Sequence, residues 1–134
     1  MNHVSPNFIA DTSVIVCLLR GDSQAEKILR GKDFAITFVT FVTFAELDVG
    51  ILKANDPLAA AQECAEVVTG LRVYHGSGRT PALYARIYHD LSKRGTMIPI
   101  NDIWIAAIAI ETNLPILARD EHFSRIRGLH VIQC

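Results

Sequence analysis

Short apolar runs of strand character alternate with helical segments along this chain, and this alternation limits the possible folds more than any other feature. The strand-like runs are Phe8–Ala10, Phe34–Phe38, Leu71–Tyr74, Leu114–Ala118 and His130–Ile132. Strands that alternate with helices are typical of a parallel sheet, because each parallel strand needs a crossover before the next one. We therefore predict an α/β fold, a three-layer α/β/α sandwich with a central parallel β-sheet covered on both faces.

The helices between these runs are predicted from apolar spacing and from residues that favour helix ends. The expected signals are a helix start after Asp11, a capping box of Ser23 and Glu26 with a stop at Gly31, a start at Thr43 and Glu46, a cap at Asp56 followed by Pro57, a helix Pro81–Arg94 that stops at Gly95, and a cap at Asn101. The helix that follows Asn101 is almost wholly apolar over Ile103–Ile110, so it must be buried.

Length and charge indicate one domain without a general attraction for nucleic acid. A chain of 134 residues, half of them hydrophobic, has enough apolar material for one core, so we expect a single domain over residues 1–134. Thirteen Lys and Arg residues against fourteen Asp and Glu residues give a net charge of −1. Any contact with RNA must therefore come from a local patch of the surface.

Cysteine usage and apolar patterning predict a cytoplasmic protein. Cys17, Cys64 and Cys134 are odd in number and lack the spacing of a metal site, and the N-terminal residues show no targeting pattern. The longest apolar stretch, residues 34–47, is broken by threonines and by Glu46 and is shorter than the roughly 20 residues that a membrane helix needs. We expect reduced thiols and no membrane span.

Four acidic residues fall where the predicted fold places ligands. Asp11 and Asp120 follow predicted strands, whereas Glu46 and Asp102 lie in the first turns of predicted helices. In an open parallel sheet, ligands bind outside the carboxyl ends of the strands. All four side chains are therefore expected to converge at that edge.

Each acid also has a purely structural explanation. Asp11 can cap a helix, Glu46 can complete a capping box with Thr43, Asp102 can interact with the positive end of its helix dipole, and Asp120 can be a turn residue. The joint pattern favours a functional centre, because an acid at the start of a buried helix is costly unless it is paired or bound to a metal.

Clustered carboxylates have a chemical use when the substrate is a phosphodiester. Without a cation they repel one another, whereas Mg²⁺ or Mn²⁺, which prefer oxygen ligands, turns them into a platform for a phosphate group. Divalent ions can lower the pKa of an attacking water and stabilise the leaving oxygen. The pattern is thus typical of metal-dependent hydrolysis.

The sequence motifs around these acids resemble those of the PIN domain, and most closely those of the VapC-like toxins of prokaryotic toxin–antitoxin pairs. The matching stretches are FIADTSVIV, TFVTFAELDVGI, PINDIWIAAIAI and LPILARDEHFSRIRGLHVI, which follow the family's order and cover nearly the whole chain. The resemblance implies a central parallel sheet and endonucleolytic cleavage of RNA. It further implies Mg²⁺ or Mn²⁺ at the four catalytic acids Asp11, Glu46, Asp102 and Asp120, with a hydroxyl aid from Ser13.

Other polar residues are weaker candidates. Between Tyr74 and Pro81 the residues HGSGRT replace a stretch that in the family often carries another acid, and they are either a surface turn or a loop that contacts substrate. Arg119 adjoins Asp120 and is our candidate for substrate binding. His89 and His122 lack partner ligands at a recognisable spacing, so neither is predicted to bind zinc.

Two other classes of α/β protein do not fit the residues of this chain. A haloacid-dehalogenase-type phosphatase would need a second Asp where Ser13 stands, and a receiver domain would need paired acids at the first strand. A housekeeping PIN nuclease and a catalytically silent interaction module stay open as alternative functions.

High apolar content and the resemblance predict a homodimer. The resemblance also implies a cognate antitoxin, which we expect to place an arginine on the acidic centre, because a guanidinium can bind two carboxylate oxygens.

Overall fold

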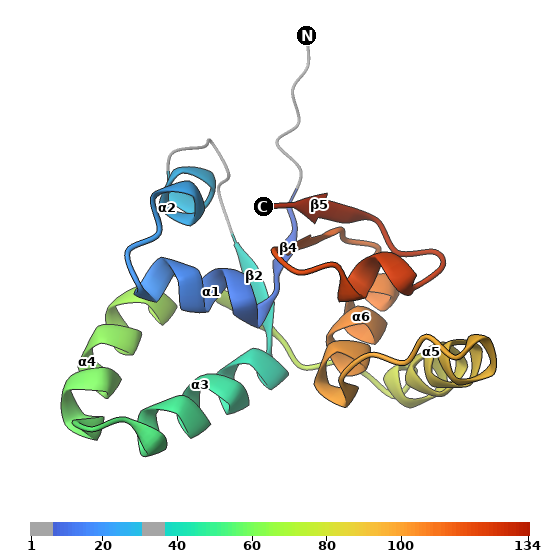
Figure 1. Ribbon diagram of the computed structural model, residues 1–134, viewed down its shortest axis with the longest axis horizontal. Helices are drawn as coiled ribbons and strands as arrows, with labels where there is room; N and C mark the ends of the chain where they lie inside the picture. Colours follow the sequence, from blue (N-terminus) through green and yellow to red (C-terminus); the bar gives the residue numbers. More distant parts are fainter. Residues whose placement is uncertain (1–6, 31–36) are drawn as a thin grey trace, which may run out of the picture.

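The computed structural model describes residues 7–30 and 37–134, which form a five-stranded parallel sheet between two groups of helices (Figure 1). The strands are β1 Ile9–Ala10, β2 Phe38–Thr40, β3 Arg72–Tyr74, β4 Ile116–Ala118 and β5 Val131–Gln133. The helices are α1 Thr12–Leu19, α2 Ser23–Arg30, α3 Phe41–Lys53, α4 Pro57–Val68, α5 Thr80–Arg94 and α6 Ile100–Thr112, with a short 3₁₀ helix, η1, at His122–Arg125. The predicted three-layer α/β/α fold is confirmed.

The strand order β3-β2-β1-β4-β5 places a topological switch at the centre of the sheet. From β1 the chain moves outward through β2 to β3, then crosses back to the other side of β1 and continues through β4 to β5. All pairings are parallel, and Ile9 and Ala10 of β1 lie opposite Ile116 and Leu117 of β4. The carboxyl ends of β1 and β4 therefore flank the switch, where open parallel sheets bind ligands.

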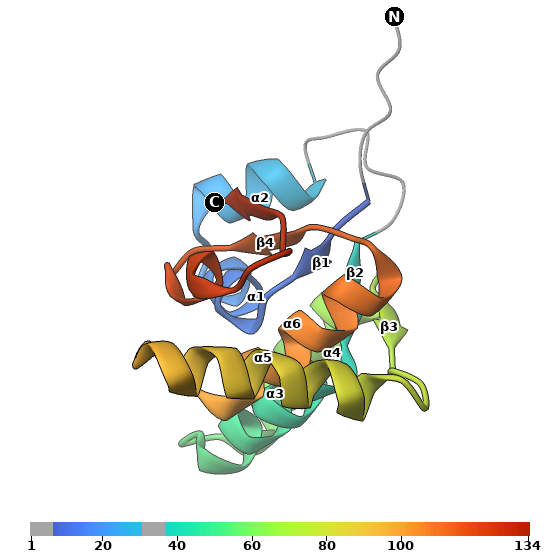
Figure 2. The ribbon, with the colours of Figure 1, turned by 90° about the vertical axis from the view of Figure 1, so that its right-hand side faces the viewer.

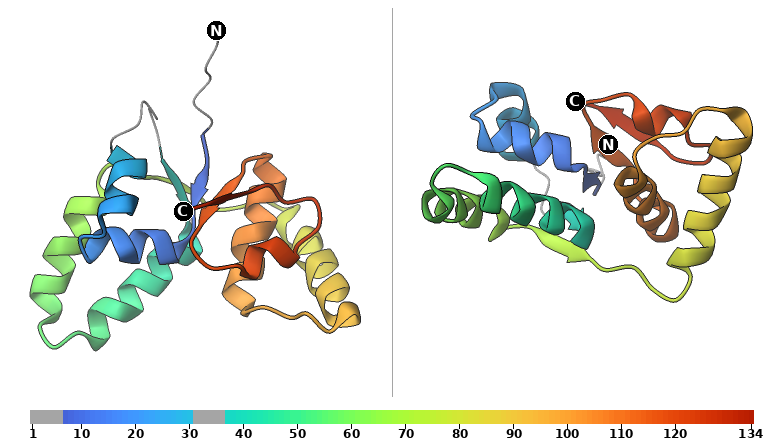
Figure 3. Two further views of the ribbon diagram at one scale, coloured as in Figure 1. Left: turned by 45° about the horizontal axis from the view of Figure 1, so that its top comes forward. Right: turned by 60° about the horizontal axis from the view of Figure 1, so that its bottom comes forward.

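Successive residues of the central strands face opposite layers, because side chains alternate along a strand. Phe8 and Ala10 pack with α1, α2, α3 and α4, whereas Ile9 packs with α5 and α6. In β4, Leu117 joins the first layer and Ile116 the second. In Figure 1, α1–α4 lie on the left of the strands and α5 and α6 on the right, and Figure 2 shows α5 crossing in front of α6. Figure 3 gives two further views of the same layers.

Helix α6 is as buried as its apolar sequence predicts. The residues Ile103 and Ile105–Ala109 are buried, and α6 makes its most extensive contact with α5. Asn113 ends α6 in the left-handed conformation, and Gly95 ends α5 in the same way, as the sequence predicts for the glycine. None of the helices in the described ranges is both long and apolar enough to cross a membrane.

Some predicted helix starts were wrong. Asp22, not Ser23, caps α2, because its Oδ1 accepts hydrogen bonds from the backbone N–H groups of Gln24 and Ala25. Helix α3 begins at Phe41 with Thr40 as its cap, so Thr43 lies inside the first turn. Asn101 also lies inside its helix, which begins after Pro99.

Two further predictions fall largely or wholly outside the described residues, and a third is confirmed. Strand β2 begins at Phe38, whereas the predicted strand Phe34–Phe38 and the predicted stop at Gly31 fall largely or wholly outside the described residues. The cap at Asp56, which accepts the N–H of Ala59, is confirmed, as is Pro57 in the first turn.

Candidate metal centre

Asp11 lies at the carboxyl end of β1 and caps α1. Its Oδ2 accepts hydrogen bonds from the Ser13 hydroxyl at 2.7 Å and from the Ser13 N–H at 3.3 Å. The side chain is buried, with only 2% of the residue exposed, and its Oδ1 has no hydrogen-bond partner among the described residues. Burial raises the pKa of this carboxyl, and the charge of Asp120 raises it further. Asp11 is thus a desolvated acid with one oxygen uncompensated.

Asp102 approaches Asp11 from the opposite layer, in the first turn of α6. Its side chain is 14% exposed. Burial raises the pKa of Asp102 to about 6, and the charge of Asp11 contributes in the same direction, while the hydrogen bond with His122 opposes them. The charge of Asp120 also raises the pKa of Asp102, which places these three predicted acids in one region of the structure.

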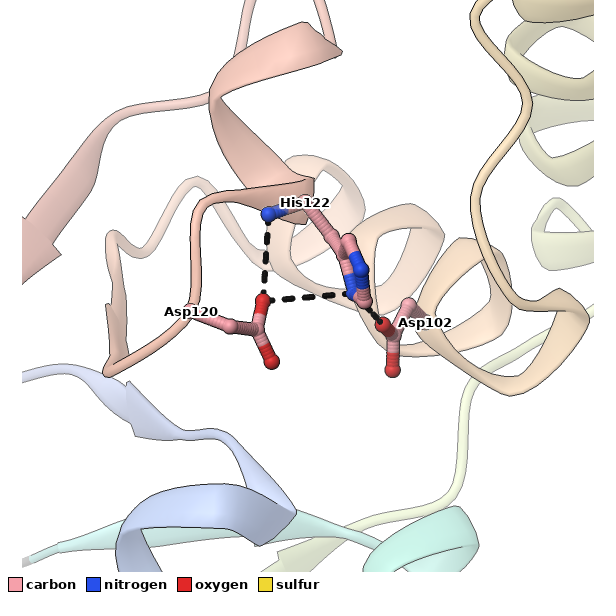
Figure 4. A group of neighbouring side chains, drawn as sticks. All are labelled: Asp102, Asp120 and His122. Carbon is pink, nitrogen blue, oxygen red and sulfur yellow. Dashed lines mark hydrogen bonds and ion pairs between the residues drawn. The ribbon is translucent and has the colours of Figure 1, made fainter.

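Asp120 and His122 follow β4 and complete this group (Figure 4). The Nδ1 atom of His122 lies 3.0 Å from Oδ2 of Asp102 and 3.3 Å from Oδ1 of Asp120. The backbone N–H of His122 also donates to Asp120 Oδ1 at 3.1 Å. One ligand atom from each of these three residues lies within 4.8 Å of the others, a spacing that can hold a metal ion.

Glu46 lies outside the group formed by Asp102, Asp120 and His122, and it contacts Thr12, the neighbour of Asp11 in sequence. The Thr12 hydroxyl donates to Oε1 of Glu46 at 2.7 Å and lies 2.8 Å from the hydroxyl of Thr43. Since Thr12 has one hydroxyl proton, Thr43 donates to Thr12 while Thr12 donates to Glu46. This chain of hydrogen bonds connects α1 to α3 and fixes the Glu46 carboxylate half-buried on the α3 surface.

Arg119 makes an ion pair away from these acids. Its guanidinium donates to both carboxylate oxygens of Asp22, at 2.7 and 3.2 Å, and to the sulfur of Cys134 at 3.4 Å. The Arg119 guanidinium holds the pKa of Asp22 well below its usual range. In this arrangement Arg119 ties the N-terminus of α2 to the end of β4, and contact with a substrate stays a prediction.

The loop between β3 and α5 is held by α6. Hydroxyl groups of Ser77 and Thr80 donate to the carboxylate of Glu111. Gly76 has φ +83°, and a Cβ there would lie 2.6 Å from Oγ1 of Thr80, so only glycine fits without strain. The observed contacts are those of an anchored turn.

Sequence reasoning did not identify three residues of the centre. His122 has no potential partner ligand near it in sequence other than Asp120. Its contact with Asp102 exists only in the folded chain. Thr12 and Thr43 carry no signal beyond their positions beside Asp11 and before Glu46. The spacing of Asp120 and His122, two residues apart at a strand end, is the one hint that the sequence offered.

The donor set fits a hard divalent cation. The carboxylates supply oxygen ligands, and the unpartnered, buried Oδ1 of Asp11 is the kind of acceptor that a bound cation would satisfy. A cation here would also relieve the repulsion that raises the pKa values of Asp11 and Asp102.

Comparisons with known proteins identify the family of this chain. Residues 8–129 match the family described as PIN domain. The chain is 31% identical to Ribonuclease VapC5 of Mycobacterium tuberculosis over 122 residues, which are 90% of this chain and 87% of that protein.

Solved structures with the same fold include VapBC2 from Rickettsia felis bound to a promoter DNA fragment, with a TM-score of 0.83, 19% identity and coverage of 95% of this chain and 98% of that one. Another is VapBC-5 from Mycobacterium tuberculosis, a member of the VapBC family of toxin–antitoxin systems, with a TM-score of 0.72, 27% identity and coverage of 96% and 98%. On the family match and the relative's identity together, this chain belongs to the PIN-domain family.

Proposed function

We propose that this chain is a Mg²⁺- or Mn²⁺-dependent endoribonuclease and the toxin of a type II toxin–antitoxin pair. The observation that carries the proposal is the convergence of Asp11, Asp102 and Asp120 at the topological switch, with one buried Asp11 oxygen unpartnered. Carboxylates held together in a desolvated place destabilise the fold unless a cation binds there.

In this proposal Asp11, Glu46, Asp102 and Asp120 hold the metal. A divalent ion held by these carboxylates would supply the positive charge that makes a bound water more acidic and offsets negative charge on the phosphodiester. The surrounding residues fix the acids in place. Ser13 holds one oxygen of Asp11, the other has no hydrogen-bond partner among the described residues, and Thr12 orients Glu46.

The substrate assignment rests on relatives. The chain's relative in Mycobacterium tuberculosis is named a ribonuclease, and it matches over nearly the whole of this chain. We extend that activity to this chain and place it in the cytoplasm, in line with its three free cysteines. Ser13 and Arg119 remain our proposed substrate contacts, and Arg119 would have to leave Asp22 to reach a phosphate.

The proposed antitoxin has a suitable surface beside Glu46. An apolar pocket of about 190 Å³ between α1, α3 and α4 is lined by Val16, Leu19, Leu47 and Ile51 and bordered by Glu46. A peptide with apolar side chains in this pocket and an arginine on the carboxylates would use both features. The toxin–antitoxin system named for a solved structure of the same fold supports such a partner.

The homodimer is likewise a proposal. Phe41, Tyr88, Met97 and Ile100 are large apolar residues that are more than a third exposed in the single chain. Exposed apolar groups of this size are typical of interfaces when they form one patch. A single species of 14.8 kDa in light scattering at micromolar concentration would contradict the dimer.

Mapping RNA ends in cells tests the toxin proposal. Induction of the wild-type chain should stop growth and create new RNA 5′ ends, whereas Asp11→Asn, which keeps the shape but removes a ligand charge, should do neither. Normal metal binding and RNA cleavage without any effect on growth would favour a housekeeping PIN nuclease. Absence of cleavage altogether would favour a catalytically silent interaction module.

A further inference from the structure

His122 stands among the acids although an all-carboxylate centre has no need of it. Its ring is carried on η1, which begins at this residue after a connection of three residues from β4, and Phe123 beside it is fully buried in the core. The anchored backbone aims Nδ1 between Asp102 and Asp120, as Figure 4 shows. A ring placed by a buried neighbour and by the backbone hydrogen bond to Asp120 is fixed by the fold.

The distances in this group are those of ligands around one ion. Two ligands at right angles on an ion with bonds of about 2.1 Å lie about 3 Å apart. The separations of Nδ1 from the oxygens of Asp102 and Asp120, 3.0 and 3.3 Å, fall near that value. In the tautomer without a proton on Nδ1, the ring nitrogen and the two carboxylate oxygens present lone pairs to one another, and a metal ion among them would remove that repulsion.

A second observation points to a cation at the same place. Asp11 is 98% buried, and its Oδ1 has no hydrogen-bond partner within residues 7–30 and 37–134. Asp11 lies near enough to Asp102 and Asp120 for their charges to interact. The orphaned oxygen is therefore a second sign that the charge of these neighbouring acids is uncompensated and that a cation would be bound there.

We propose that Nδ1 of His122 is a direct metal ligand and makes this centre selective for Mn²⁺ over Mg²⁺. The inference rests on the proposed metal dependence and specifies which ion the site takes. Carboxylate sites accept Mg²⁺ and Mn²⁺ alike, whereas an imidazole nitrogen favours transition metals. Mg²⁺ also gives up its water shell reluctantly, so it gains less than Mn²⁺ from a nitrogen ligand.

Calorimetry on the full chain tests the selectivity. The wild type should bind Mn²⁺ at least about tenfold more tightly than Mg²⁺, and His122→Asn should weaken Mn²⁺ binding by about tenfold while changing Mg²⁺ binding by less than about twofold. His89→Asn is the matched control, because His89 is an exposed histidine of α5, and it should leave both affinities unchanged.

Electron spin echo envelope modulation of the Mn²⁺ complex gives a readout independent of activity. The wild type and His89→Asn should show ¹⁴N coupling from a directly bound imidazole, and His122→Asn should lack it. Tight Mn²⁺ binding without ¹⁴N coupling, or with an unchanged affinity in His122→Asn, would overturn the His122 inference and leave the proposed nuclease intact. Failure of the wild type to bind either ion would overturn both.

Discussion

Asp11 and Asp102 come from opposite layers of the sandwich, yet burial together with the charge of Asp11 raises the pKa of the Asp102 carboxyl to about 6. Their charges interact because Asp11 directly follows β1 and Asp102 lies in the first turn of α6. Without a cation, the folded chain therefore stores an unfavourable electrostatic interaction at the site of the proposed chemistry.

The first prediction is that Asp102→Asn stabilises the metal-free protein in a pH-dependent way. Asp102 has a folded pKa above its unfolded value of 3.8, so the folded state binds more protons between about pH 4 and 6, and stability falls as pH rises through that window. At pH 8 the substitution should stabilise the fold by up to about 3 kcal/mol, since a tenfold change in proton affinity is worth about 1.4 kcal/mol.

Urea unfolding in EDTA at pH 4 and pH 8 measures this effect. The gain should be large at pH 8 and small at pH 4, where the wild-type carboxyl is protonated in the folded state and carries no charge to repel its neighbours. A gain of equal size at the two pH values would show that electrostatic strain is not its source.

The second prediction concerns stabilisation by the metal. Mn²⁺ should raise the Tm of the wild type, because a ligand that binds only the folded state stabilises it by about 2.7 kcal/mol at a hundred times its Kd. Asp11→Asn should lose this shift. Asp56→Asn is the control, since Asp56 caps α4 at an exposed place, and its Tm should still rise with Mn²⁺. Equal shifts in all three proteins would place the ion elsewhere.

The third prediction separates fold from substrate binding at Arg119. Arg119→Ala should lower the Tm, because it releases the cap residue Asp22 and detaches α2 from the end of β4. Asp22 has a lowered pKa, so its stabilising contribution is present above its usual value of 3.8 and is lost as pH falls below it. Asp22→Ala should therefore reproduce the loss at pH 7.

In a double-mutant cycle, the two changes should be clearly less than additive. If Arg119→Ala leaves the Tm unchanged but weakens RNA binding, the ion pair is unimportant and the proposed substrate contact is the better account of this residue.

The fourth prediction is that Thr43 positions Glu46 through Thr12. Thr43→Val keeps the shape of a fully buried side chain but removes its hydroxyl, which should destabilise the fold by about 1–3 kcal/mol and weaken Mn²⁺ binding. Thr43→Ser should restore most of the Mn²⁺ affinity. Calorimetry on the three proteins checks this, and unchanged affinity in Thr43→Val would remove Thr43 from the site.

The strands and helices with a clear apolar periodicity could be predicted from the sequence. The apolar run before Asp11 and the apolar segment after Asp102 correctly place Asp11 directly after β1 and Asp102 in the first turn of α6, because strand and helix periodicities leave little choice there. The parallel sheet followed from the alternation of these patterns.

Contacts between residues far apart in sequence could not be predicted from local patterns. Nothing near His122 in sequence reveals Asp102, which lies 20 positions away, or links Arg119 to Asp22, which lies 97 positions away. Both Thr40 and Thr43 are residues that favour a helix cap, so the sequence does not distinguish them. In the structure α3 begins at Phe41, which makes Thr40 the cap.

Cleavage of RNA by the purified chain tests the central claim most directly. With Mn²⁺ or Mg²⁺, the wild type should cut a single-stranded RNA, EDTA should abolish the cutting, and Asp102→Asn should lose it while remaining folded. The control Asp56→Asn should cut as the wild type does. Cleavage that persists in EDTA, or in Asp102→Asn, would contradict a metal-dependent nuclease built on these acids.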